Sequence, residues 1–141
     1  MENMIRNKVI PIVNENDVVA DEEIRADIAL GDNDLLASLL TKLIRADLLI
    51  MLTTVDGLRE TRGGKSHRVK YLESITRNTY ALVTGSKSKL SKGGMASKLR
   101  AAESVSNTGC SALIANGRQN GVLTRIMSGC DVGTLILASA I

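Results

Sequence analysis

The sequence has almost no aromatic side chains: among 141 residues there is no Phe or Trp, and Tyr71 and Tyr80 are the only tyrosines. Proteins that bind single-stranded nucleic acid stack its bases on aromatic rings, and this composition offers almost no such platform. Between Arg59 and Arg100, eleven basic residues stand against two acidic ones. That run fits a small polyphosphate ligand at least as well as a nucleic acid, or it is simply a solvated basic face. We therefore do not expect nucleic acid as a partner.

Cysteine is scarce, and long apolar runs are missing. Cys110 and Cys130 stand outside any metal-ligand spacing, so we expect two buried free thiols and no metal held by protein side chains alone. No segment approaches the roughly 20 apolar residues that a membrane-spanning helix needs. The first eight residues, MENMIRNK, are not followed by the apolar stretch of a signal peptide. These absences predict a cytoplasmic protein without a membrane partner.

The charge that is present is unevenly distributed. Residues 1–34 carry nine acidic and three basic side chains, whereas residues 35–141 carry six acidic and fifteen basic ones. Apolar residues make up 44% of the chain, which is enough to bury a core at this length. No internal repeat and no long linker divides the sequence, so we expect one domain.

Short apolar runs alternate with helical patterns, which favours an α/β fold. Strands are expected at 8–13, 47–54, 68–72, 81–83, 111–115 and 134–138. Helices are expected at 33–45, 73–80, 95–107 and 119–128, and a flexible loop at 84–94. Pro11 favours an edge position for the first strand, or a strand that is not hydrogen-bonded at that residue. The alternation predicts a mainly parallel sheet, whose ligands bind in the loops at the carboxyl ends of the strands.

The first of these helices has a marked apolar stripe. Its members recur at helical spacing: Leu35, Leu36, Leu39, Leu40, Leu43 and Ile44. Lys42 and Arg45 fall outside the stripe. The pattern predicts an amphipathic helix that begins near Asn33.

A glycine pair precedes the helix expected at 95–107. Gly93 and Gly94 stand at its start, and Lys98 lies in its first turns. Backbone N–H groups at a helix start can cradle phosphate oxygens where glycine lets the ligand approach, and a nearby lysine adds charge. A Gly-Gly pair before a helix is more often only a turn, so this motif is weak when taken alone.

Two acidic loops add to that signal. NEND at 14–17 follows a predicted strand, and Asp17 could hold the ammonium group of a small zwitterion, although an Asx-rich turn is the simpler explanation. GDND at 31–34 precedes the first helix, where Asp32 or Asn33 is a good N-cap. A cap does not need three such residues. A carboxylate near a transferring phosphoryl group can organise lysines or Mg²⁺, so the combination suggests a kinase.

Five runs occur in a characteristic order: IPIVNENDVV, GDNDLLASLL, ADLLIMLTTVDGL, KGGMASKLRAA and IANG. Together they resemble the glutamate 5-kinases of the amino-acid kinase family, over essentially the whole chain. The resemblance implies a three-layer α/β sandwich with a mainly parallel central sheet. It also implies ATP-dependent phosphorylation of the L-glutamate γ-carboxylate to γ-glutamyl phosphate, the first step of proline biosynthesis, with Mg²⁺ brought by ATP.

The resemblance implies roles for individual residues. Asp17 and Asn33 would contact L-glutamate, Asp17 through the α-ammonium group. Asp34 and Lys98 would be catalytic, because Asp34 would orient lysines around the phosphoryl group and Lys98 would stabilise the transition state. The ATP-binding residues would be Thr53, Thr54, Lys92, Gly93, Gly94, Met95, Ala96, Ser97 and Lys98.

The sequence departs from the family pattern in three respects. Thr54 stands where the family usually has Asp, and Ser91-Lys92 stand where it usually has Gly-Thr. The resemblance is confined to the second half of the kinase domain, without the opening strand, glycine-rich turn and phosphate-binding lysine, and without an RNA-binding-like C-terminal domain. We therefore expect residues 1–141 to be the ATP-side portion of a kinase domain. Alone it should have negligible activity, and it should self-associate or need a complementary N-terminal half.

Two other functions remain compatible with the sequence. The chain could be a non-catalytic binding or association module from a split or degenerate kinase, which the missing phosphate-binding half and Thr54 favour. Retention of Asp17, Asn33, Asp34 and Lys98 favours an enzyme instead. A weaker third possibility is the kinase portion of a bifunctional pyrroline-carboxylate synthase, which uses similar motifs.

Overall fold

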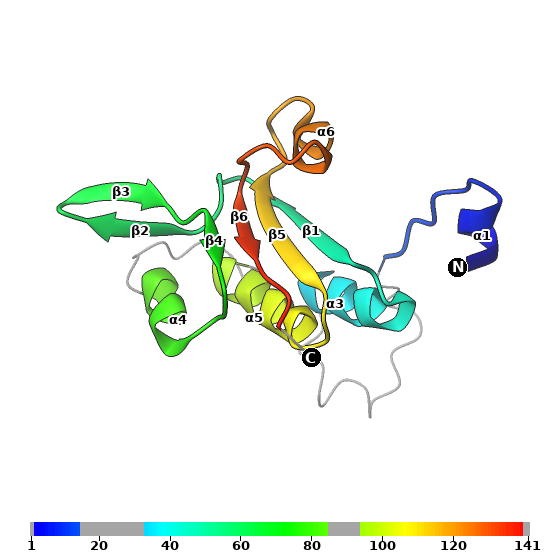
Figure 1. The fold of residues 1–141 in the computed structure, drawn as a ribbon, viewed down its shortest axis with the longest axis horizontal. Coiled ribbons are helices and arrows are strands. Elements are labelled where there is room, and N and C mark those ends of the chain that lie inside the picture. The colour runs from blue at the N-terminus through cyan, green and yellow to red at the C-terminus, as the bar shows by residue number, and fades with distance from the viewer. Residues whose placement is uncertain (1, 15–32, 85–93, 140–141) are drawn as a thin grey trace.

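A four-stranded sheet forms the centre of the computed structural model, which describes residues 2–14, 33–84 and 94–139 (Figure 1). The strand order is β1-β5-β6-β4. The strands are β1 (Leu48–Thr53), β4 (Tyr71–Leu72), β5 (Ser111–Asn116) and β6 (Thr134–Ile136). β1 pairs parallel with β5, β4 pairs parallel with β6, and β5 pairs antiparallel with β6. The expectation of an α/β fold with a mainly parallel central sheet is confirmed.

Helices lie on two sides of this sheet, the first helix of the chain lies apart from it, and a hairpin extends from it (Figure 1). The helices are α1 (Glu2–Arg6), α3 (Asn33–Ile44), α4 (Arg77–Thr84), α5 (Met95–Ser106) and α6 (Val122–Met127). The hairpin consists of β2 (Arg59–Arg62) and β3 (Lys65–Arg68), which pair antiparallel. Within the described ranges, no helix has the length and apolar character needed to span a membrane.

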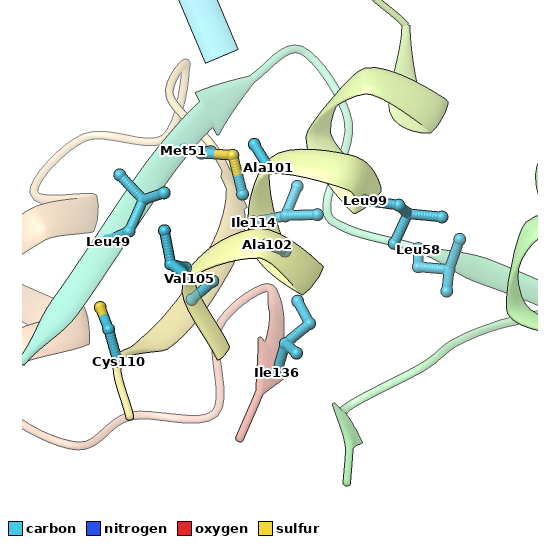
Figure 2. Close-up of a cluster of buried hydrophobic side chains, with 11 residues drawn as sticks. Leu49, Met51, Leu58, Leu99, Ala101, Ala102, Val105, Cys110, Ile114 and Ile136 are labelled. Atoms are coloured by element: carbon cyan, nitrogen blue, oxygen red, sulfur yellow. The ribbon is translucent and has the colours of Figure 1, made fainter. Parts of the chain in front are cut away.

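The main core lies between α5 and one face of the sheet (Figure 2). Leu99 and Val105 of α5 are fully buried there against Met51 of β1 and Ile114 of β5. The opposite face carries a smaller cluster of Leu113, Ala115, Val122 and Val132. β5 is thus buried on both faces, which explains why its sequence is a continuous apolar run rather than an alternating one.

Small side chains bring α3 close to α5. Ser38 and Thr41 of α3 are buried, and each hydroxyl donates a hydrogen bond to a carbonyl of its own helix, so neither is left unsatisfied (2.8 and 2.7 Å). The predicted apolar stripe of this helix is not its buried face. Leu39, Leu43 and Ile44 are 46%, 78% and 43% exposed, because α3 packs through its small residues.

Two predicted strands are absent from the structure. Residues 9–14 adopt no regular structure, and Ile10 and Ile12 are 86% and 94% exposed. A strand needs a hydrogen-bonded neighbour, and no described strand pairs with this segment, whose Pro11 has no N–H to donate. Residues 81–83 belong to α4 instead, since a three-residue apolar run cannot be told from a helical segment by its pattern.

The other predicted elements are present with shifted ends. The strands expected at 47–54, 111–115 and 134–138 are β1, β5 and β6, and the helices expected at 95–107 and 119–128 are α5 and α6. The run 68–72 is divided between β3 and β4, and the helix expected at 73–80 begins later, as α4. Most of the loop expected at 84–94 lies outside the described residues. Cys110 is buried as expected, whereas Cys130 is exposed, which corrects the prediction of two buried thiols.

Candidate active site

The starts of α3 and α5 meet at one place in the fold. α3 precedes β1 and α5 precedes β5, and these two strands run parallel. The two helices also pack against each other along their length (Figure 1). Residues at the start of each helix are therefore brought together near the carboxyl ends of the strands, where open α/β sheets bind ligands.

Asp34, in the first turn of α3, is held by two residues of α5. The Lys98 ammonium group donates to both carboxylate oxygens of Asp34 at 2.9 Å. The Ser97 hydroxyl donates to Asp34 Oδ2 at 2.7 Å. The Lys98 and Asp34 side chains are only 13% and 15% exposed. A charged pair this deeply buried is costly to desolvate unless it is well hydrogen-bonded, as this one is.

The backbone at the start of α5 completes this cluster. Gly94 is the N-cap, and as a glycine it has no side chain with which to cap the helix. The Gly94 carbonyl accepts hydrogen bonds from the backbone N–H groups of Ser97 and Lys98, and the Ser97 hydroxyl lies 3.1 Å from it. A helix start without a side-chain cap has N–H groups and a partial positive charge to offer an anion.

The other predicted site residues that the structure describes lie at the end of β1 and at the starts of α3 and α5. Thr53 ends β1 and is half-buried, whereas Thr54 follows it and is exposed. Asn33, the first residue of α3, is exposed, and Met95 and Ala96 are half-buried at the start of α5. Three predicted residues, Asp17, Lys92 and Gly93, lie outside the described residues, as does Asp32, the candidate cap.

The cluster can present a positioned cation. An ammonium group has three N–H donors, so Lys98 keeps a donor for a ligand after its hydrogen bonds to Asp34. Asp34 fixes the direction of the lysine, and Ser97 fixes the direction of Asp34. A phosphate group at the start of α5 would meet backbone N–H groups and this ammonium group together. Among the described residues, no group of three His, Cys, Asp or Glu side chains could hold a metal ion.

The sequence of the chain matches a known family. The sequence model described as "Amino acid kinase family" matches residues 1–116. The chain belongs to the amino acid kinase family. The Asp34–Ser97–Lys98 cluster lies within the matched residues.

Individual relatives show which members of the amino acid kinase family the chain resembles. Glutamate 5-kinase from Caldanaerobacter subterraneus subsp. tengcongensis is 41% identical over 140 residues, which cover 97% of this chain and 37% of that protein. Glutamate 5-kinase from Lactiplantibacillus plantarum is 38% identical over 137 residues, which cover 95% of this chain and 52% of that protein. The resemblance to the glutamate 5-kinases is confirmed. The chain spans only about a third to a half of the length of these relatives.

Solved structures agree with the fold of the amino acid kinase family. Carbamate kinase from Giardia lamblia, bound to AMP-PNP, superposes with a TM-score of 0.54 and 25% identity over 77% of this chain and 36% of that one. Uridylate kinase from Archaeoglobus fulgidus gives a TM-score of 0.55 at 20% identity over 77% of this chain and 49% of that one, a likeness of fold alone.

Two features of the described residues escaped the sequence prediction. The Ser97 hydroxyl donates to the Asp34 carboxylate, and a serine one residue before a lysine carries no sequence signal for that contact. At the ends of β1 and β5, Asp56 Oδ1 accepts hydrogen bonds from the amides of Asn116 (2.9 Å) and Gln119 (3.1 Å). The Asp-Gly turn signal at Asp56 did not reveal these partners, because they lie about sixty residues away in the sequence.

Proposed function

We propose that this chain forms the nucleotide side of a glutamate 5-kinase. The reaction would transfer the γ-phosphoryl group of ATP, bound with Mg²⁺, to the γ-carboxylate of L-glutamate. The observation that carries the proposal is the Lys98–Asp34 pair, supported by Ser97, at the start of α5. Identity of about 40% to glutamate 5-kinases supports this choice of substrate. We further propose a cytoplasmic location and a role in proline biosynthesis, by the same likeness.

Lys98 would neutralise charge on the transferring phosphoryl group. Phosphoryl transfer needs little covalent help from the protein, so positioned cations and N–H donors provide most of the acceleration. Asp34 would aim the Lys98 ammonium group and prevent it from swinging into solvent. The start of α5, from Gly94 to Ala96, would hold phosphate oxygens, and Mg²⁺ would accompany ATP. The AMP-PNP bound to the similarly folded carbamate kinase makes a nucleotide at this fold a reasonable expectation.

Thr53 and Asn33 would complete the contacts to the two substrates. Thr53 ends β1 beside the start of the helices, which suits a contact with the nucleotide. Asn33 is exposed and adjacent to Asp34, so its amide is accessible to L-glutamate. Asp17 and Lys92 are proposed to bind glutamate and ATP on the strength of the resemblance alone.

Full activity would need further parts of the kinase domain. The chain spans about a third to a half of the relatives, and their remaining residues would add cations around the phosphates. We therefore propose that γ-glutamyl phosphate forms only when a complementary kinase half, from a second polypeptide or a longer chain, is present. A non-catalytic association module remains the alternative.

Nucleotide binding tests the proposal directly. Titration of the chain with Mg-ATP should release heat, and Lys98→Ala should weaken the affinity about tenfold or more, because a charge-assisted contact to phosphate is lost. Lys65→Ala removes an exposed lysine at the start of β3 and should leave the affinity unchanged. Lys98→Arg retains the charge and should recover part of the affinity.

Activity is measured as γ-glutamyl hydroxamate formed from glutamate, ATP and hydroxylamine. The chain mixed with the remaining segment of a relative's kinase domain should form hydroxamate, and the Lys98→Ala chain should not. Binding of neither ATP nor glutamate by the unmodified chain would refute the kinase proposal and favour the association module.

A further inference from the structure

We propose that a pocket between the β2–β3 hairpin and α6 binds a phosphate-bearing small molecule through Arg59, Arg68 and Arg125. The pocket has a volume of about 300 Å³. None of its nine lining residues is among those assigned above to ATP or glutamate. The proposal therefore does not depend on the proposed kinase activity.

Two of the arginines form an unusual cross-strand pair. Arg59 of β2 and Arg68 of β3 are direct partners in the hairpin register, and both line the pocket. Like charges placed directly opposite each other on adjacent strands destabilise the pair. Arg59 donates only to the Ser66 hydroxyl (2.8 Å) and the Ser66 carbonyl (3.0 Å), so no described carboxylate neutralises it. A bound anion between the two guanidinium groups would remove this repulsion.

Arg125 approaches the pocket from α6. Its Nη1 donates to the Gln119 side-chain oxygen at 3.2 Å, and Gln119 in turn donates to Asp56 at 3.1 Å. This chain of contacts orients the guanidinium group with a neutral partner and leaves most of its five N–H donors for a ligand. Among the described residues, Arg125 is therefore a positioned cation without a carboxylate partner.

The carboxylates at the pocket do not cancel its positive charge. Three arginines and two aspartates line the pocket, which leaves a net charge of +1. Asp131 pairs with Arg68 and also with Lys70, at 2.8 Å, so it is shared between two cations. Lys70, first among its partners, lowers the pKa of Asp131, which therefore stays ionised. Asp56 accepts from two amides and so helps to hold the pocket wall.

The walls of the pocket are fixed by buried contacts. Gly133, the residue before β6, has a φ of 73°, and a Cβ atom there would collide with the Ile114 carbonyl. The backbone at this position therefore packs closely against β5. At the base of the hairpin, the buried Thr134 hydroxyl accepts from the Leu58 N–H (2.9 Å) and donates to the Val69 carbonyl (2.6 Å). The three arginines thus project from elements that are anchored to the sheet.

Phosphate is the ligand chemistry that fits these groups. A guanidinium group matches the oxygens of phosphate with paired, charge-assisted hydrogen bonds, which is why clusters of arginine favour this anion. The volume is at the small end of the range for ligand pockets, suited to a diphosphate or a small phosphorylated metabolite. The phosphate groups could also belong to a nucleotide, and the experiment separates these sources.

The test is calorimetric titration of the 141-residue chain with inorganic diphosphate. We expect saturable binding that weakens about tenfold in each of two variants, Arg59→Gln and Arg125→Gln, since each removes a charge-assisted donor pair. Both side chains are exposed, and circular dichroism checks that the fold is retained. Arg62→Gln is the matched control, because Arg62 lies in the same hairpin outside the pocket and should bind diphosphate like the unmodified chain.

Lys98→Ala separates this pocket from the start of α5. Diphosphate binding that survives Lys98→Ala supports the pocket, even if ATP binding and kinase activity are both absent. In that variant, competition by ATP would identify nucleotide phosphates as the source, and lack of competition would identify a free or small-molecule phosphate. No diphosphate binding, binding by both arginine variants that is as tight as that of the unmodified chain, or loss of binding through Lys98→Ala alone would overturn the proposal.

Discussion

Tyr80 joins α4 to α5 through its hydroxyl, which donates a hydrogen bond to Glu103 Oε2 at 2.7 Å. Burial, followed by the Glu103 carboxylate through the hydrogen bond that it accepts and through its charge, raises the pKa of Tyr80 from its ordinary value of 10.0 to about 12. The folded chain therefore holds this proton more tightly than the unfolded chain does. The corresponding stabilisation is complete below pH 10 and is lost as the pH rises towards 12.

Tyr80→Phe should expose this contribution. At neutral pH the variant should be less stable by about 1–2 kcal/mol, because the Glu103 carboxylate loses a hydrogen bond. The difference in unfolding free energy between the two proteins should shrink above pH 10, because Tyr80 then ionises in the unfolded state of the unmodified chain. Urea denaturation at several pH values measures it. Tyr71→Phe, at an exposed tyrosine, is the control and should have little effect; a Tyr80→Phe difference that grows with pH would contradict the argument.

At the scale of elements, one buried hydroxyl anchors the β2–β3 hairpin to the sheet. Thr134 is fully buried in β6 and bonds Leu58 before the hairpin and Val69 after it. Both ends of the hairpin are thereby tied to one side chain. The hairpin was not among the predicted elements. Gly63-Gly64 between two short polar runs was a usable turn signal, but β2 and β3 lack the apolar alternation that marks a strand.

Thr134→Val should weaken this anchor. Valine has nearly the same shape but leaves the Leu58 N–H and the Val69 carbonyl without their partner, at a cost of roughly 2–4 kcal/mol in unfolding free energy. Thr134→Ser keeps the hydroxyl and loses one methyl group, so it should cost about 1 kcal/mol. Urea denaturation followed by circular dichroism compares them. Equal stability of the two variants would show that the hydroxyl does not anchor the hairpin.

At the scale of the whole molecule, apolar side chains remain on the surface. Leu43 of α3 is 78% exposed, and Ile10 and Ile12 are exposed further still. An amphipathic helix usually buries its apolar stripe, and large exposed apolar patches mark sites of association. This exposure favours the prediction that the chain associates with itself or with a complementary half.

Sedimentation of the chain over a range of concentrations should therefore reveal species larger than a monomer. Leu43→Glu should reduce that association, because it places a charge in the exposed stripe of α3. Met127→Glu, at a side chain 74% exposed on α6, is the matched control and should change the association less. A monomer at every concentration, with a cooperative thermal transition, would contradict the prediction.

The sequence by itself determined the α/β class, the family and most of the elements. Apolar runs and helical periodicity are local signals, so β1, β5 and α5 were predictable from them. Local signals failed where the outcome depended on distant partners. Residues 8–13 have the composition of a strand but no described neighbour, and the leucine stripe of α3 is displaced from the core by Ser38 and Thr41.

Only the tertiary structure decided how the chemically important groups meet. The resemblance implied that Asp34 orients lysines. The structure shows that its partners are Lys98 and Ser97, which lie 64 and 63 positions away in the sequence. The arginine pocket likewise joins a hairpin to α6, although its members are ordinary surface residues in the sequence. The physical reason is the same in both cases. Electrostatic and hydrogen-bonding contacts depend on separations of a few ångströms in space, and sheet pairing and helix packing create those separations between residues that lie far apart along the chain.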